Sequence, residues 1–368
     1  MPRRVQARKL SVEHIQRRVS RALRQGIVYD SIEELLRDEI LEEEKIPLYE
    51  RKRRRRRRLA ITNAEGEVGG EVVGSLAAEE FDLIAIVREF QHAMHILEIV
   101  SHALHLGGRH KKQEAKVKIV RDDFSDEERL ASVLARVSQV LHLSAPVQKG
   151  AAPDVTMREG VKPAIAVAGA CRRAGVDRLI FASSEGHLSG APKPGEGAAA
   201  SAPKMLSEEA VKVSGIPYVL ARFPTVYSSA SFSSLLAQAK GKAALLAEDR
   251  KMNLMHVEDM AAAFSKILRH PKVQNQEMNF MGESLTRGEC CEAISRQLVG
   301  ASLAAGAGLK KDDFFARTVG PVPLQSKPPG QASADARKIR RLVGFSPSKN
   351  FSKGVREYLA ARASSGAP

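Results

Sequence analysis

Short, strongly apolar segments recur along the chain from residue 59 onward, and polar or glycine-bearing turns separate them. Four of these segments are four to seven residues long and rich in branched side chains, at 59–62, 81–87, 117–120 and 140–143. Such runs are typical of strands buried inside a protein. Between the second and the third segment, residues 89–106 carry apolar positions at helical spacing, which predicts an amphipathic packing helix.

The first 58 residues follow a different pattern. Four apolar residues near the start have helical spacing: Val12, Ile15, Val19 and Leu23. Because residues 1–25 contain eight basic residues and one acidic residue, a basic amphipathic helix is predicted there. It is either an organelle transit peptide or a retained arm that docks onto a partner. An acidic helical stretch is expected next, at 31–45.

Eight consecutive cations, from Arg51 to Arg58, end this extension. Like charges repel one another, so such a run is either a solvated linker or a segment that an anionic partner neutralises. Since no aromatic side chain interrupts the run, any RNA contact there would be made to phosphates rather than to stacked bases. We expect docking to RNA or to a large protein or ribonucleoprotein assembly, and a linker is the alternative.

Composition narrows the class of protein. Of 368 residues, 43% are hydrophobic, which suffices for one large domain or a domain pair with a substantial core. The 58 Lys and Arg exceed the 43 Asp and Glu by 15, a surplus that suits a polyanionic neighbour. No run approaches the roughly 18 uninterrupted apolar residues of a membrane span, so no transmembrane segment is expected.

The three cysteines, two of them adjacent, cannot build a disulfide framework. We therefore expect a reducing compartment or an organelle interior, a mitochondrion or a plastid, with the protein soluble or peripheral there. The cytoplasm is the less favoured alternative.

A glycine-bearing turn separates the first apolar segment from a predicted helix at 71–80. Its sequence, from Asn63 to Gly70, is NAEGEVGG. A strand, a glycine-rich turn and a helix N-terminus together form a pyrophosphate site, because free backbone N–H groups and the helix dipole point toward it. We expect the pyrophosphate to lie over residues 66–69.

Arg88 directly follows the second apolar segment. An acidic residue at this point would accept a hydrogen bond from a ribose 2′-hydroxyl, whereas an arginine accommodates a 2′-phosphate. Arg88 therefore favours NADP(H) over NAD(H), and an unrelated surface arginine is the alternative.

Further motifs follow in order along the chain. They are DF at 123–124, HLSA at 142–145, GVDRLIFASS at 175–184, PYVLARFP at 217–224, HVEDMA at 256–261, DARK at 335–338 and LVGFSP at 342–347. With TNAEGEVG at 62–69, they resemble the motifs of the short-chain dehydrogenase/reductase superfamily, in its extended, epimerase-like branch and the atypical relatives of that branch. In this resemblance Asn63 replaces the first glycine of TGxxGxxG.

The resemblance implies an α/β fold, a doubly wound parallel Rossmann sheet with helices on both faces and a small C-terminal lobe. Four parts are expected: a basic helical extension at 1–58, an NAD(P)-binding domain at 59–225, a substrate-type lobe at 226–350 that completes the same fold, and a C-terminal helix and tail at 351–368. The cofactor would lie across the carboxyl ends of the strands. The expected cofactor-binding residues are Thr62, Asn63, Ala64, Gly66, Glu67, Val68, Gly69, Arg88, Asp123, Phe124, Leu143, Ser144, Ala145, Pro146, Lys204 and Phe223.

The expected catalytic centre departs from the family pattern. Active members use Tyr-x-x-x-Lys, in which the tyrosine transfers a proton and the lysine lowers the pKa of that tyrosine. Lys204 has the lysine position, but Ala200 stands where the tyrosine would be. Glu185, after Ser183 and Ser184, stands where epimerase-like members carry the active hydroxyl. Lys204, Ser183 and Glu185 are therefore vestigial candidates, and no residue is assigned a catalytic role.

Two interpretations remain open at this point. The fold is a pseudoenzyme that holds NADP(H) as a structural part, or it is an atypical reductase whose proton comes from water or from Glu185. Degenerate superfamily members recur as accessory subunits, for example in respiratory complex I and in plastid or mitochondrial RNA assemblies. We expect an accessory subunit of a respiratory complex, a photosynthetic complex or a ribonucleoprotein. The alternatives are a free NADP-dependent reductase or epimerase, and an RNA-binding protein on this fold.

Histidines and cysteines add no further site. His92, His95, His102 and His105 share roughly one face of the helix at 89–106, and imidazoles could bind a transition metal. No cysteine or carboxylate pattern completes a recognised site, so a packing helix is favoured and no metal is expected. The adjacent cysteines at 290–291 are expected to be buried and structural.

Overall fold

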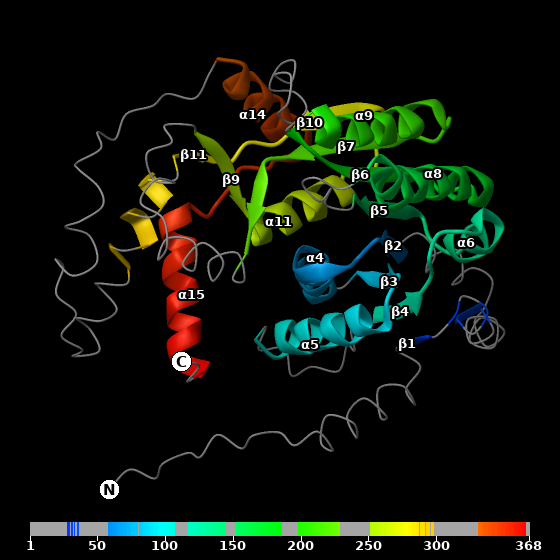
Figure 1. Cartoon of the computed structure of the whole chain (residues 1–368), viewed down its shortest axis with the longest axis horizontal. Coiled ribbons are helices and arrows are strands. Elements are labelled where there is room, and N and C mark those ends of the chain that lie inside the picture. The colour runs from blue at the N-terminus through cyan, green and yellow to red at the C-terminus, as the bar shows by residue number, and fades with distance from the viewer. Residues whose placement is uncertain are drawn as a thin grey trace, which may run out of the picture.

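The computed structural model describes most of the chain after residue 57 (Figure 1). The described residues are 28–29, 31, 33, 35–36, 58–79, 81–106, 117–144, 152–185, 198–228, 251–286, 288–290, 292–294, 296–297 and 330–365. The predicted basic helix around 12–23, the cations at 51–57 and the expected cofactor residues Ala145 and Pro146 lie outside them, as does Cys291.

A parallel sheet of eight strands forms the centre of the molecule, in the order β1-β4-β3-β2-β5-β6-β7-β10. The strands are β1 (Val28–Tyr29), β2 (Arg58–Thr62), β3 (Asp82–Val87), β4 (Val117–Arg121), β5 (Gln139–Leu143), β6 (Arg178–Ser184), β7 (Tyr218–Phe223) and β10 (Gln276–Asn279). The four apolar segments of the sequence match β2 to β5 to within one residue at each end. The predicted doubly wound Rossmann sheet is therefore confirmed.

Helices cover both faces of this sheet (Figure 1). On one face lie α4 (Gly66–Ala78), α5 (Phe90–Leu106) and α11 (Val257–Leu268). On the other face lie α6 (Glu127–Leu134), α8 (Lys162–Ala174) and α9 (Ala198–Val213), with the short α7 (Pro153–Thr156) and the π-helical turn Met157–Val161 leading into α8. The predicted amphipathic helix at 89–106 corresponds to α5.

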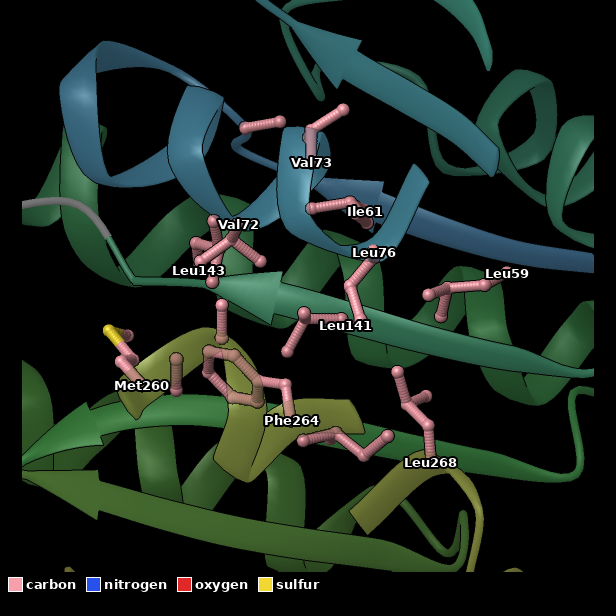
Figure 2. Packing of buried hydrophobic residues seen from close by; sticks show 14 of the residues in the cluster. Leu59, Ile61, Val72, Val73, Leu76, Leu141, Leu143, Met260, Phe264 and Leu268 are labelled. Carbon is pink, nitrogen blue, oxygen red and sulfur yellow. The ribbon is translucent and has the colours of Figure 1, made fainter. Parts of the chain in front are cut away.

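The apolar core has two layers because each strand is covered on both sides. In β2, Leu59 and Ile61 face α4 and α11, whereas Ala60 between them faces the opposite layer. Figure 2 shows the first layer, in which Leu141 of β5 packs beside Phe264 of α11. Strands buried on both faces have near-continuous apolar sequences, which is why they were visible as apolar runs.

A smaller sheet and two helices complete the C-terminal part. The sheet contains β8 (Thr225–Tyr227), β9 (Met252–His256) and β11 (Glu283–Leu285), and the helices are α14 (Gly330–Val343) and α15 (Phe351–Ser365). In the DARK motif, Asp335 accepts a hydrogen bond from Asn279 (3.0 Å) and Lys338 Nζ donates to the carbonyl of Glu277 (2.7 Å). These two contacts attach α14 to β10 of the main sheet.

The first helix after the glycine turn begins earlier than predicted, at Gly66 instead of residue 71. Its glycines are tolerated because they allow close packing. A Cβ on Gly69 would lie 2.4 Å from the carbonyl carbon of Ala64, and a Cβ on Gly70 would lie 2.4 Å from Cδ1 of Ile99 in α5. The glycines therefore lie inside the helix and do not form a longer turn.

The N-terminal extension contributes to the sheet, which the helical prediction for it did not foresee. Residues Val28 and Tyr29 form β1, an edge strand of the sheet, which pairs with Ile119 and Val120 of β4. Residues 33, 35 and 36 are helical, in agreement with the start of the predicted acidic helix.

Arg58 is not part of a free cationic run. It begins β2, is 2% exposed, and its Nε lies 3.1 Å from Oδ2 of Asp82 in the neighbouring strand. Burial in the sheet and this ion pair remove Arg58 from the expected RNA-docking segment.

Two absences hold for the described residues alone. None of the helices there combines the length and the apolar character that a membrane crossing requires. No group of three or more His, Cys, Asp or Glu side chains there has an arrangement suited to a metal ion. Cys171 and Cys290 lie in buried positions, as expected for Cys290.

Candidate nucleotide-binding site

The strand order reverses direction at β2. The chain runs from β2 to β3 and β4 on one side, and from β5 to β6 and β7 on the other. In open α/β sheets the crevice at such a switch point, beyond the carboxyl ends of the strands, is where ligands bind. Here it lies between the turn after β2 and the end of β5.

The turn after β2 has the conformation that the glycine motif requires. Asn63 has φ 57° and Gly66 has φ 71°, both in the left-handed region. Asparagine tolerates this region better than most residues, so Asn63 can replace the family's first glycine. Gly69 lies against the Ala64 carbonyl, where any side chain would collide with backbone. These are the turn and the close approach that a dinucleotide cradle needs.

Side chains bridge the switch point directly. Asn63 Nδ2 donates to the carbonyl oxygen of Leu143 (2.5 Å), and Thr62 Oγ1 lies 2.8 Å from Nδ1 of His142. Desolvation of the buried ring, with a smaller contribution from the charge of Arg88, lowers the pKa of His142 to about 3. His142 is therefore a neutral imidazole, stacked on Phe181.

Arg88, at the end of β3, is held by a residue of the glycine turn. The carboxylate of Glu65 accepts hydrogen bonds from Arg88 Nε (3.0 and 3.1 Å), Nη2 (2.8 Å) and the Arg88 backbone N–H (2.5 Å). These hydrogen bonds raise the pKa of Arg88. The ion pair between Glu65 and Arg88 is an interaction that sequence analysis missed. The signal that could have revealed it is an acidic residue directly before Gly66, in a motif that otherwise binds anions.

The loop after β4 carries the expected cofactor residues Asp123 and Phe124, in different environments. Asp122 is buried and accepts hydrogen bonds from the Phe124 N–H (2.8 Å) and from Arg129 (2.5 Å). Desolvation raises the pKa of Asp122, against the effect of both donors. Asp123 is exposed, and hydrogen bonding from Ser125 lowers its pKa. Phe124 is buried with φ 61°. Of the two adjacent carboxylates, Asp123 therefore faces solvent and Asp122 does not.

The remaining expected cofactor residues fall into two groups. Leu143 and Ser144 lie at the end of β5, where Leu143 contacts Asn63 of the turn after β2, and the Ser144 N–H donates to the carbonyl of Ala182 in β6 (3.3 Å). Phe223 is 1% exposed and packs between Phe264 and Phe280 in the apolar core. The structure therefore places the Phe223 ring inside the core.

The vestigial catalytic residues come from β6, from the residue after it, and from α9. Ser183 near the end of β6 is buried, and its Oγ has no hydrogen-bond partner among the described residues. Lys204 of α9 is largely buried, and desolvation lowers its pKa although Glu208 one turn further acts in the opposite direction. Glu185 follows β6, and burial raises its pKa.

The C-terminal sheet reaches Glu185. Asn253 of β9 donates from Nδ2 to Oε2 of Glu185 (2.9 Å), and Oδ1 of Asn253 accepts from the Gly282 N–H (2.8 Å). Sequence analysis missed Asn253, because an isolated asparagine in a strand carries no motif. Glu185 is thus fixed by both parts of the fold.

The cradle fits a dinucleotide. The N-terminus of α4 points at the crevice, and within the described chain its N-cap residue Glu65 makes no side-chain hydrogen bond to the first turn of the helix. Backbone N–H groups of that turn are therefore available to a phosphate. Residues 62–69 would hold the pyrophosphate, and Arg88 with Glu65 would face the adenosine ribose.

Comparisons with known proteins agree with this class, an extended short-chain dehydrogenase/reductase fold with a nucleotide cradle. The NmrA-like family matches residues 55–309, and the chain belongs to this family. No curated protein matches the chain significantly.

Among solved structures, a UDP-glucose-4-epimerase from Stenotrophomonas maltophila, with bound NAD and formylated UDP-arabinopyranose, is 16% identical with a TM-score of 0.60. The match covers 84% of this chain and 99% of that one. The Bordetella bronchiseptica enzyme WbmG, in complex with NAD and UDP, is 16% identical with a TM-score of 0.57, covering 84% and 94% of the two chains. A UDP-N-acetylglucosamine 4-epimerase from Bacillus cereus is 17% identical, with a TM-score of 0.55 and coverage of 83% and 99%. At such identities the likeness shows a shared fold.

Proposed function

We propose that this protein binds NAD(P)(H) and acts mainly as an accessory subunit of a large organellar assembly, with little or no catalysis of its own. One observation carries the proposal: the nucleotide cradle is intact, while α9 has alanine where active relatives have the proton-transferring tyrosine. A bound nucleotide would stabilise the fold by mass action without any turnover.

The local chemistry around Lys204 supports a loss of catalysis. Ala200 and Lys204 are one helical turn apart in α9, the arrangement of Tyr-x-x-x-Lys, and an alanine side chain has no proton to transfer. The carboxyl group of Glu185 is bound to Asn253, so it is tied into the fold.

NADP(H) is the proposed form of the cofactor. The support is Arg88 at the end of β3, the place where an arginine accommodates a 2′-phosphate. The enzymes from Stenotrophomonas maltophila and Bordetella bronchiseptica were solved with NAD, so the two forms have to be compared directly by binding.

The assembly and its compartment are proposed from charge. The surplus of 15 positive charges, with seven consecutive cations remaining at 51–57, suits a polyanionic partner such as RNA or an acidic protein face. A mitochondrial or plastid location is consistent with the basic, acid-poor N-terminus.

A free NADP-dependent reductase or epimerase is the second candidate. It is favoured by Ser183, whose buried hydroxyl is unpartnered among the described residues, and by the desolvated Lys204. NADPH-dependent reduction or epimerisation of a nucleotide sugar by the purified chain, abolished in Lys204→Met, would establish it.

The experiment that tests the first proposal is sedimentation of the native protein from gently lysed source cells, with and without ribonuclease. We expect migration with a particle far larger than the 40.1 kDa chain. A shift to small particles after ribonuclease would assign the partner as a ribonucleoprotein, and an unchanged position would assign a respiratory or photosynthetic complex. Migration at 40.1 kDa or a small multiple without ribonuclease would contradict the accessory-subunit role.

A further inference from the structure

The carboxylate of Glu65 binds Arg88, the arginine that would receive the 2′-phosphate of NADP(H). Although Glu65 is the N-cap residue of α4, within the described chain its side chain does not cap that helix. It turns instead to the end of β3, where it binds the Arg88 guanidinium and the Arg88 backbone N–H. The side chains of the pair are 13% and 28% exposed, so the contact is largely shielded from water.

We propose that Glu65 is a specificity-determining residue, which competes with the 2′-phosphate of NADP(H) for Arg88 and thereby limits the affinity of the site for that cofactor. This inference rests on the proposed nucleotide binding and deepens it. The competition is between an internal carboxylate and a ligand phosphate for the same cation.

The geometry explains why the two anions exclude each other. An arginine recognises a carboxylate or a phosphate best through a pair of parallel N–H groups. Glu65 takes one such pair, Nε and Nη2, together with the backbone N–H of the same residue. A 2′-phosphate, which carries about two negative charges, must displace this carboxylate or bind beside it with mutual repulsion.

An unphosphorylated ribose meets no such penalty. Its 2′-hydroxyl is uncharged and can donate a hydrogen bond to a carboxylate at this position. Glu65 therefore acts selectively against the 2′-phosphate and leaves NAD(H) binding largely unaffected.

The test variant is Glu65→Gln in the full chain. Glutamine has nearly the same shape and its amide oxygen can still accept the Arg88 N–H, so the turn is retained while the charge is removed. Glu159→Gln is the matched control, because Glu159 acts on Arg88 through its charge without a hydrogen bond to it. Arg88→Met removes the group for which the two anions compete.

Binding is measured by isothermal titration calorimetry with NADPH, NADH, 2′,5′-ADP and 5′-AMP, since the chain contains no tryptophan for fluorescence quenching. Thermal unfolding of each variant without ligand confirms that it is folded. We expect Glu65→Gln to tighten binding of NADPH and 2′,5′-ADP about tenfold or more, and to change binding of NADH and 5′-AMP by less than about threefold. Glu159→Gln should change the affinity for each of the four nucleotides by less than about threefold. Glu65→Gln in the Arg88→Met background should give no gain in affinity for NADPH or 2′,5′-ADP.

Failure of this inference and failure of nucleotide binding are distinguishable. If the wild type binds NADPH or NADH and Glu65→Gln alters both equally or not at all, the role of Glu65 is wrong and the cradle stands. If no folded variant binds any of the four nucleotides, the proposed function itself is wrong and the inference falls with it.

Discussion

His142 is an imidazole enclosed between the nucleotide cradle and Phe181. Its burial makes the charged form costly, which is the physical reason for the lowered pKa. A histidine at the carboxyl end of a strand, beside a ligand crevice, can easily be taken for an acid–base catalyst. Its environment identifies it as a neutral hydrogen-bonding partner of Thr62.

This burial predicts a pH dependence of stability. The folded-state pKa of His142 is about 3, below the ordinary 6.5, so the unfolded chain binds the proton more readily. The contribution of the neutral, buried His142 to the free energy of unfolding is full above pH 6.5 and is lost as the pH falls toward 3. Between pH 7 and pH 5 we expect the free energy of unfolding to lose about 2 kcal/mol through this residue.

Urea denaturation at pH 5 and pH 7 measures the effect, and His142→Gln should reduce the difference between the two pH values by about the same 2 kcal/mol. His270→Gln, at an exposed histidine, is the control. Parallel pH profiles for wild type and His142→Gln would show that His142 is not buried as described.

At the scale of elements, Asp259 connects the N-terminus of α11 to the segment before α15. Its carboxylate is 2% exposed and accepts from the Ser348 N–H (3.0 Å), the Ser348 hydroxyl (2.8 Å) and the Lys349 N–H (2.9 Å). The HVEDMA motif therefore has a structural role in this protein. Its Asp259 carboxylate holds the segment before α15 in place, and we call this set of hydrogen bonds the clip.

Removing the clip should release α15. Asp259→Ala removes the buried carboxylate that accepts three hydrogen bonds from Ser348 and Lys349, so we expect a loss of about 3 kcal/mol in the free energy of unfolding. Hydrogen exchange at Ser348, Lys349 and the amides of α15 should accelerate in this variant. Glu258→Ala is the matched control: its carboxylate pairs with Lys349 (2.7 Å) but is 53% exposed, so its loss should cost about 1 kcal/mol or less. Equal effects of both variants would contradict the clip.

At the scale of the whole molecule, the N-terminal extension is joined to the Rossmann domain by more than a linker. Strand β1 pairs with β4, and Leu35 is 0% exposed within the second core layer. Glu33 lies 3.9 Å from Arg129, which also binds Asp122, next to the expected cofactor residues Asp123 and Phe124. The extension therefore contacts helix α6 beside the loop that follows β4.

This docking predicts that a residue outside the domain boundary contributes to global stability. Leu35→Ala should cost about 3 kcal/mol in urea denaturation, the usual magnitude for emptying a buried leucine site. Leu36→Ala, at a partly buried neighbour, should cost about 1 kcal/mol. If Leu35→Ala left stability unchanged, the extension would not pack on the sheet in solution.

The sequence by itself determined the four strands β2 to β5 and the glycine turn. Strands covered on both faces need continuous apolar residues, and a left-handed turn with a close backbone approach needs asparagine and glycine, so both leave local signals. The ordered motifs also placed Ala200 one turn before Lys204, because helical spacing is local.

Tertiary structure alone decided which side chains meet. The pairs Glu65 with Arg88, Asn253 with Glu185, and β1 with β4 join positions 23 to 91 residues apart, and no local pattern specifies such partners. The same holds for burial. Arg58 and Phe223 resemble a docking cation and a ligand contact in the sequence, yet the fold encloses both side chains. Long-range packing, which sets the neighbours and the solvent exposure of each group, gives each motif its final chemistry.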